Sequence, residues 1–289
     1  MARMKLALSQ VSLSSVEADL LVVFVSGPEF AKQASFRELD RAFSGELVKI
    51  AKHEDFTGKK GQALTVHTLG KLAAKKLRLV ALGGKDDLGE EIRLAAVQVA
   101  RLIGGLKHVA VFAPSSDSAH LKCLAEGLLL GDYKYAEFLS GSRKPKPSPK
   151  CTIVLAHKPS SADKRALEEA EIIGESVNFT RDLVNRPPNE MTSAALAQEA
   201  KKLAREHGIR CTVWGKQEIA KQGMNLLMAV NAGSEEEPRF IHMAYVPKGK
   251  PKAPRIVFVG KGLTFDAGGL SVKPAKSMET MKCDMAGAA

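Results

Sequence analysis

The chain has 289 residues, of which 45% are hydrophobic, 26% charged and 5% aromatic. This length exceeds one ordinary compact domain, so we expect two domains with aliphatic cores. The sequence has no apolar run long enough to span a membrane and no secretory signal pattern near its start, which predicts a cytoplasmic protein without membrane association. Its four cysteines lie far apart without a CxxC pair, which favours reduced thiols over disulfides or a zinc cluster.

The formal net charge of +11 raises the alternative of nucleic-acid binding. The one acid-free basic stretch, residues 140–160, interleaves its lysines with prolines and has no aromatic residue on which a base could stack. We interpret this stretch as a solvated segment between two domains, and we treat nucleic acid as a weaker candidate partner.

The first half of the chain alternates strand-like and helix-like patterns, which predicts an α/β domain with a mostly parallel sheet over residues 1–160. A Gly83-Gly84-Lys85 sequence follows one of the strands, but it matches no phosphate-binding motif and is interpreted as a tight turn. The expected strands are residues 19–25, 63–68, 77–82, 108–113 and 152–156, and the expected helices are residues 36–52, 90–106 and 119–130.

Residues 161–190 read as a linking helix that ends at Pro187-Pro188, because proline lacks the amide donor that a helix needs. The apolar face expected for this helix consists of Leu167, Ala170, Ile173, Val177 and Leu183. A second α/β domain is expected over residues 191–289. It begins with a helix that Thr192 caps and that runs to His207, and it continues with strands at 211–214, 240–246 and 255–260 and a short helix at 216–222.

The most informative stretch follows the apolar run at residues 255–260, which reads as the strongest strand of the second domain. In open α/β sheets, ligands bind beyond the carboxyl ends of strands, and the glycine-rich loop at this position carries four charged residues. Two lysines and two carboxylates in such a setting suggest a metal or anion site, although two Lys–Asp salt bridges would account for the same groups. The four residues are Lys261, Asp266, Lys273 and Asp284.

Longer motifs in this region resemble the leucyl aminopeptidase family, the cytosol aminopeptidases of peptidase family M17. The stretch VGKGLTFDAGGLSVKP, followed by METMKCDMAGAA, resembles the family's metal-binding core. The stretches NFTRDLVNRPPNEMTSAALAQEAKKLA and GMNLLMAVNAGSEEEPRFIHMAYVP resemble the segments before that core, so the resemblance covers about residues 175–289. The first domain fits the family's variable, macro-like N-terminal domain.

The resemblance implies an enzyme that releases N-terminal amino acids, preferentially leucine, from peptides with two divalent metal ions, Mn²⁺ or Zn²⁺. It implies that Lys261, Asp266 and Asp284 are metal ligands, with Asp266 bridging the two ions. Lys273 would be the catalytic lysine, whereas Lys282 would have a supporting role beside Asp284. The resemblance also implies assembly into homo-hexamers.

The family's second signature, of the form NTDAEGR, does not occur in these 289 residues. It would supply two further carboxylate ligands and a catalytic arginine that holds bicarbonate. The resemblance therefore implies an incomplete catalytic domain and a chain that is inactive alone. The alternatives from other functional classes are a non-catalytic DNA-binding or regulatory protein, and an assembly partner within the family's hexamers.

Overall fold

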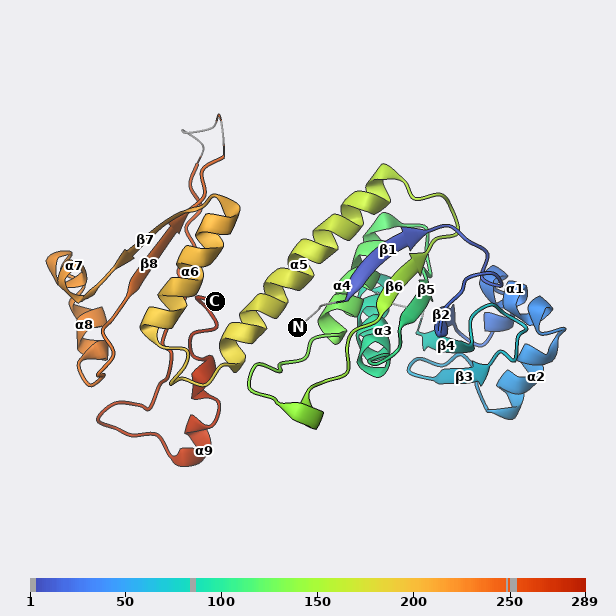
Figure 1. Cartoon of the computed structure of the whole chain (residues 1–289), viewed down its shortest axis with the longest axis horizontal. Coiled ribbons are helices and arrows are strands. Elements are labelled where there is room, and N and C mark those ends of the chain that lie inside the picture. Colours follow the sequence, from blue (N-terminus) through green and yellow to red (C-terminus); the bar gives the residue numbers. More distant parts are fainter. Residues whose placement is uncertain (1–3, 84–86, 248, 250–253) are drawn as a thin grey trace. The chain divides into compact units, whose positions relative to one another are not determined.

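The computed structural model describes residues 4–83, 87–247, 249 and 254–289 (Figure 1). The chain divides into two compact units, of which the first extends to Asn178 and the second is Phe179–Ala289. The division falls inside the long helix α5 (Ser161–Asn185). No helix in the described ranges is both long and apolar enough to cross a membrane.

The first unit is built on a six-stranded sheet of order β1-β6-β5-β2-β4-β3. Every neighbouring pair is parallel except β3 and β4, which confirms the predicted α/β fold with a mostly parallel sheet. The strands are β1 (Lys5–Ser9), β2 (Leu20–Ser26), β3 (Ala63–His67), β4 (Lys76–Leu82), β5 (His108–Phe112) and β6 (Lys150–Val154). The helices besides α5 are α1 (Ala34–Ala42), α2 (Glu46–His53), α3 (Leu88–Leu102) and α4 (Ser118–Gly131).

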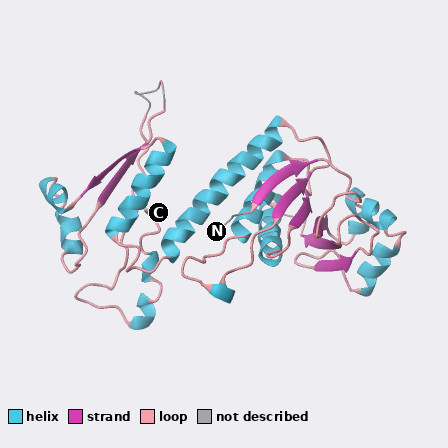
Figure 2. Ribbon diagram, viewed as in Figure 1, coloured by secondary structure: helices cyan, strands magenta, loops and turns pink. Residues whose placement is uncertain are grey.

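Strand β2 supplies both cores of this unit, because successive side chains of a strand point to opposite faces of the sheet. Val22 and Phe24 join the core formed with α3 and α4. Leu21 and Val23 join the core formed with α1 and α2. Figure 2 shows helices on both faces of the sheet, as parallel sheets require.

Two predictions in the first unit were wrong. The helix expected at residues 36–52 is divided into α1 and α2, because Ser44 and Gly45 adopt positive φ angles of 57° and 80° that a right-handed helix does not allow. Residues 140–160 do not lie between the two units, because β6 is paired between β1 and β5 inside the first. The turn expected at Gly83-Gly84-Lys85 lies largely outside the described residues.

Helix α5 packs on the first unit through small residues, and the apolar face expected for it was partly wrong. Ile173 and Val177 are more than one-third exposed. A side chain at Gly174 would lie 2.9 Å from the Cβ of Leu129 on α4, so the two helices approach closely there. The inward positions follow i, i+4 spacing and are Ala166, Ala170, Gly174 and Asn178.

Glycines also set the contact between α3 and α4. A Cβ on Gly127 would lie 2.3 Å from the carbonyl oxygen of Arg93, and one on Gly131 would lie 2.5 Å from that of Val97. Both distances are shorter than van der Waals contact allows, and both involve backbone atoms that cannot rotate away. The absence of side chains on one helix therefore permits the close packing of the pair.

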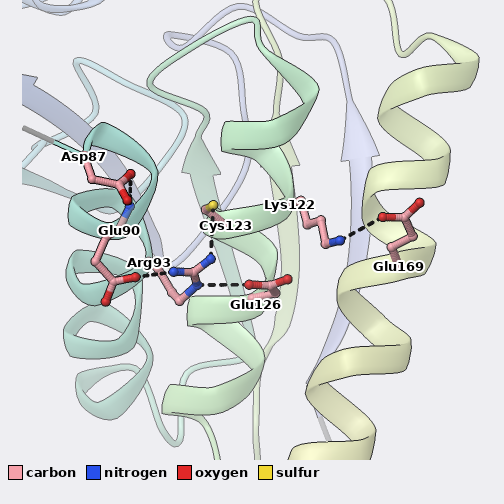
Figure 3. A network of polar contacts seen from close by, with 7 residues as sticks. All are labelled: Asp87, Glu90, Arg93, Lys122, Cys123, Glu126 and Glu169. Carbon is pink, nitrogen blue, oxygen red and sulfur yellow. Dashed lines mark hydrogen bonds and ion pairs between the residues drawn. The ribbon is translucent and has the colours of Figure 1, made fainter. Parts of the chain in front are cut away.

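Polar side chains also join helices α3, α4 and α5 (Figure 3). Arg93 on α3 donates from Nε to Glu126 Oε2 on α4 at 2.9 Å and also pairs with Glu90. Glu126 is only 6% exposed, so the guanidinium compensates a buried carboxylate. Lys122 on α4 pairs with Glu169 on α5 at 2.8 Å.

The buried carboxylate of Asp163 takes part in capping the amino end of α5. The Asp163 carboxylate accepts from the backbone amide and the hydroxyl of Ser160, and the Ser160 hydroxyl accepts in turn from the Asp163 amide, which is a reciprocal capping box. Ser118 and His157 also hydrogen-bond to it. Burial alone raises the pKa of Asp163, but these hydrogen bonds outweigh it and hold that pKa well below its usual range.

The second unit is smaller and has an antiparallel sheet of two strands, β7 (Arg210–Trp214) and β8 (Phe240–Ala244). Its helices besides the end of α5 are α6 (Ser193–His207), α7 (Lys216–Lys221), α8 (Asn225–Asn231) and α9 (Ala275–Met278). Thr192 caps α6 by accepting from the amide of Ala195, which confirms that prediction. The core of this unit is formed by Leu183, Met191, Leu196 and Met285.

The strand expected at residues 255–260 is wrong. These residues have no regular secondary structure, and Phe258 and Val259 are more than 90% exposed. An apolar run becomes a strand only where a neighbouring strand pairs with its amides and carbonyls. Among the described residues, β7 and β8 form the only sheet of this unit, and neither pairs with the run.

Replacing Gly127 by alanine should destabilise the first unit by about 1–3 kcal/mol, because the new methyl group must push the α3 backbone away. Urea unfolding followed by circular dichroism measures the change. Gly233→Ala is the control, because a Cβ there meets nothing within 4 Å. Equal destabilisation by the two variants would contradict the packing account.

Replacing Asp163 by asparagine should cost about 1–3 kcal/mol at neutral pH, because hydrogen bonds to a charged acceptor are lost. The folded-state pKa of Asp163 lies below its unfolded value of about 4, so its contribution is complete above pH 4 and is lost as the pH falls through the folded-state pKa. The stability difference from wild type should therefore be constant between pH 5 and 7 and shrink below about pH 4. Urea unfolding at each pH checks this, with the exposed Asp55→Asn as control. A difference that grew in acid would contradict the assignment.

Candidate metal and catalytic loop

The structure brings the four predicted site residues together in the last 30 residues of the second unit. Lys261 Nζ lies 2.8 Å from Asp284 Oδ2, and Lys273 Nζ lies 2.7 Å from Asp266 Oδ2. These are the two Lys–Asp pairs that the sequence offered as the alternative to a metal site. Two carboxylates and two amines thus meet in one loop region, with no net charge among the four.

A tight turn holds Asp266 beside Lys273. The carboxylate of Asp266 accepts from the amide of Gly268 at 2.8 Å, and the amide of Lys273 donates to the Ala267 carbonyl at 2.9 Å. Gly268 has a φ of 95°, and a Cβ there would lie 2.5 Å from the Ser271 carbonyl oxygen. Only glycine fits both the angle and the space, so the sequence at this position determines the turn.

A contact between two glycines brings Lys261 and Asp284 together. A Cβ on Gly260 would lie 2.1 Å from the carbonyl oxygen of Gly287. The backbone that precedes Lys261 therefore lies directly against the backbone that follows Asp284. Twenty-three positions separate these two residues in the sequence, and this backbone contact makes their side chains neighbours.

The two ion pairs change the acidity of their members. The close contact with the Asp284 carboxylate raises the pKa of Lys261, and the charge of Asp266 acts in the same direction. The hydrogen bond from Lys273 and the amide of Gly268 lower the pKa of Asp266. In the metal-free chain Lys261 is thus an ammonium at neutral pH, and it must lose a proton before its nitrogen can bind a metal.

The donor atoms fit a divalent cation in type. Carboxylate oxygens and a neutral amine are suitable ligands, and the Oδ2 atom of Asp284 is buried without a well-angled hydrogen bond from any described donor, although the Lys261 ammonium faces it. The set is small, however. In the described part of the chain, no group of three or more histidine, cysteine, aspartate or glutamate side chains is arranged to hold a metal ion.

Two further contacts surround the four residues. Lys273 Nζ also lies 3.1 Å from the Met281 sulfur, and Lys282 Nζ donates to the carbonyl of Asn185 at 3.0 Å. The contact of Met281 with Lys273 could not be predicted from the sequence, because a methionine in an apolar pattern is typical of a core residue. The Gly260–Gly287 contact was also missed, since no local pattern marks a glycine for a distant neighbour.

Comparison with known proteins gives the family. Residues 21–142 match the N-terminal domain of the cytosol aminopeptidase family, and residues 178–289 match its catalytic domain. The chain is 40% identical over 261 residues to a probable cytosol aminopeptidase of Geobacter sp. (strain M21), covering 88% of this chain and 53% of that protein. It is 37% identical over 256 residues to the one of Aquifex aeolicus, covering 86% of this chain and 50% of that protein. The chain belongs to the cytosol aminopeptidase family, and it spans about half the length of these curated relatives.

Solved structures of similar proteins agree with this family membership. A mutant of tomato leucine aminopeptidase superposes with a TM-score of 0.82 at 26% identity, covering 99% of this chain and 57% of that one. A bottromycin maturation enzyme in complex with Mn superposes with a TM-score of 0.73 at 26% identity, covering 94% of this chain and 54% of that one. These findings confirm the family resemblance stated from the sequence, including the two-domain fold.

Proposed function

We propose that this chain provides the N-terminal domain and the first part of the catalytic domain of a metal-dependent aminopeptidase, which removes N-terminal residues, preferentially leucine, from peptides in the cytoplasm. The observation that carries the proposal is the meeting of Lys261, Asp266, Lys273 and Asp284 in the segment that matches the family's catalytic domain. The Mn-bound bottromycin maturation enzyme supports a divalent metal.

In this proposal Lys261, Asp266 and Asp284 would hold two divalent cations, Mn²⁺ or Zn²⁺. When bound, such cations supply a Lewis acid for the scissile carbonyl and lower the pKa of the attacking water. Asp284 and Asp266 would then be cation ligands instead of partners of the two ammonium groups. Lys261 would be a ligand only as a neutral amine, after losing its proton to solvent.

Lys273 has a different role in the proposal. With Asp266 as a cation ligand, the Lys273 ammonium would lose its present partner and would be free to approach a substrate carbonyl. There it stabilises the negative charge that develops on oxygen during peptide-bond hydrolysis. A bicarbonate ion and a homo-hexameric assembly belong to the same proposal for the complete family site.

The proposal predicts which lysine binds metal. Lys261→Met and Asp284→Asn should each weaken Mn²⁺ binding by about tenfold or more, because each removes a ligand. Lys273→Ala should retain or strengthen Mn²⁺ binding, because it removes the ammonium that competes for Asp266. Isothermal titration of the 289-residue chain measures all three, and the exposed Lys276→Met is the control. If only Lys273→Ala lost Mn²⁺ binding, Lys273 would be the metal ligand and Lys261 the catalytic lysine.

The proposal also predicts weak catalysis by these 289 residues. Leucine p-nitroanilide should be hydrolysed negligibly even with Mn²⁺, because the NTDAEGR-like residues that would add two carboxylates and an arginine are absent from the sequence. Any residual rate should need a free substrate amino group and should fall by about 10²-fold in Lys273→Ala. Robust turnover of leucine p-nitroanilide, with or without Mn²⁺, would contradict this prediction, and equal cleavage of N-acetyl-leucine p-nitroanilide would contradict the assignment of the site.

A further inference from the structure

Lys282 lies beside the site, and its side chain does not point to the other site residues. Its ammonium donates at 3.0 Å to the carbonyl of Asn185, the last residue of α5. The final carbonyls of a helix lack intrahelical donors and carry the negative end of the helix dipole. Lys282 therefore provides a cation where α5 ends, two residues before Pro187.

The residues on both sides of Asp284 in the sequence hold it in place. Lys282 is the middle residue of the 3₁₀ helix Met281–Cys283, and the amide of Asp284 donates to the carbonyl of Met281 at 3.3 Å. On the other side, Met285 is fully buried in the core with Leu183. Asp284 is thus held between a polar contact to α5 and an apolar contact to the core beneath it.

We propose that Lys282 is a positioning residue, which fixes Asp284 opposite Lys261 by capping the carboxyl end of α5. Met285 holds the same segment by burial, but apolar burial is non-directional. The hydrogen bond from Lys282 supplies the direction that burial lacks. The inference rests on the proposed function in that Asp284 is taken as a metal ligand, and it goes further by connecting the ligand to the end of a helix.

The chemistry of the contact determines which substitutions preserve it. Lys282→Met keeps the length and apolar stem of the side chain but removes the charge and the donors. Lys282→Arg keeps the charge and the donors, since a guanidinium also donates to helix carbonyls. Lys276→Met is the matched control, because Lys276 is an exposed lysine on α9 in the same region.

Hydrogen exchange tests the contact without metal. The amides of Ala286 and Ala288 donate to Cys283 and Met285, and their exchange reports whether the segment stays in place. Exchange in residues 279–289 should accelerate by about tenfold in Lys282→Met and should stay near wild type in Lys282→Arg and Lys276→Met. The fluorescence of Trp214, stacked on Phe240 at 5.1 Å, shows whether the second unit is folded in each variant.

Mn²⁺ titration of the same proteins tests whether the position of Asp284 affects metal binding. Lys282→Met should bind Mn²⁺ about 10-fold more weakly, as loss of a supporting contact to a ligand does, and Lys282→Arg should restore binding to within about 3-fold. Wild-type exchange and affinity in folded Lys282→Met would overturn the proposal, as would a failure of Lys282→Arg to restore them. If the wild-type chain bound no Mn²⁺, the proposed function would fail, and the exchange rates would still decide whether Lys282 holds the segment.

Discussion

Pairing of backbone hydrogen-bonding groups is the constraint on which the rest of this structure depends. Strand β2 and residues 255–260 are similar runs of aliphatic residues, and both read as buried strands. Strand β2 has β4 on one side and β5 on the other, so its amides and carbonyls are paired and both of its faces are covered. The run at 255–260 has no paired neighbour among the described residues, and it is exposed and irregular.

This difference bears on the candidate site. In an open α/β sheet, a strand fixes the loop beyond its carboxyl end. Here the loop that starts at Gly260 has no strand to fix it, and its shape comes instead from the Gly260–Gly287 contact and the turn at Gly268. The segment that contains Asp284 is in turn held by the buried side chain of Met285. Glycine contacts, one buried methionine and the hydrogen bond of Lys282 to α5 thus hold the segments that a sheet would otherwise position.

The sequence predicts those parts of both units that depend on local pattern, and the reason is physical. Strands such as 19–25 and 108–113 are continuous apolar runs whose neighbours lie within the same unit, so local pattern and tertiary pairing agree. The break at Ser44 and Gly45 and the exposure of Ile173 depend on backbone angles and on partners, which composition does not reveal. Thr192 could be predicted as a cap because capping is local.

In the candidate site, too, local features could be predicted and distant contacts could not. The motif places Lys261, Asp266, Lys273 and Asp284 in one region, and the structure pairs them. Which lysine faces which carboxylate could not be predicted, because the pairing of Lys261 with Asp284 follows from a backbone contact between residues 27 positions apart in sequence, Gly260 and Gly287. Similarly, Met281 and Lys282 have contacts that only the folded chain reveals.

The balance of charge at the site links its folding to its chemistry. A carboxylate pair without a partner would repel and would destabilise a loop that has few other contacts. With two ammonium groups in place, the four side chains are neutral together, so the loop can form before any cation arrives. If the proposed site binds a cation, binding would be an exchange, in which a divalent ion displaces the proton of Lys261 and separates Lys273 from Asp266. Under the proposal, metal affinity would be the difference between two favourable states, and it would rise with pH, because binding by Lys261 requires loss of its proton.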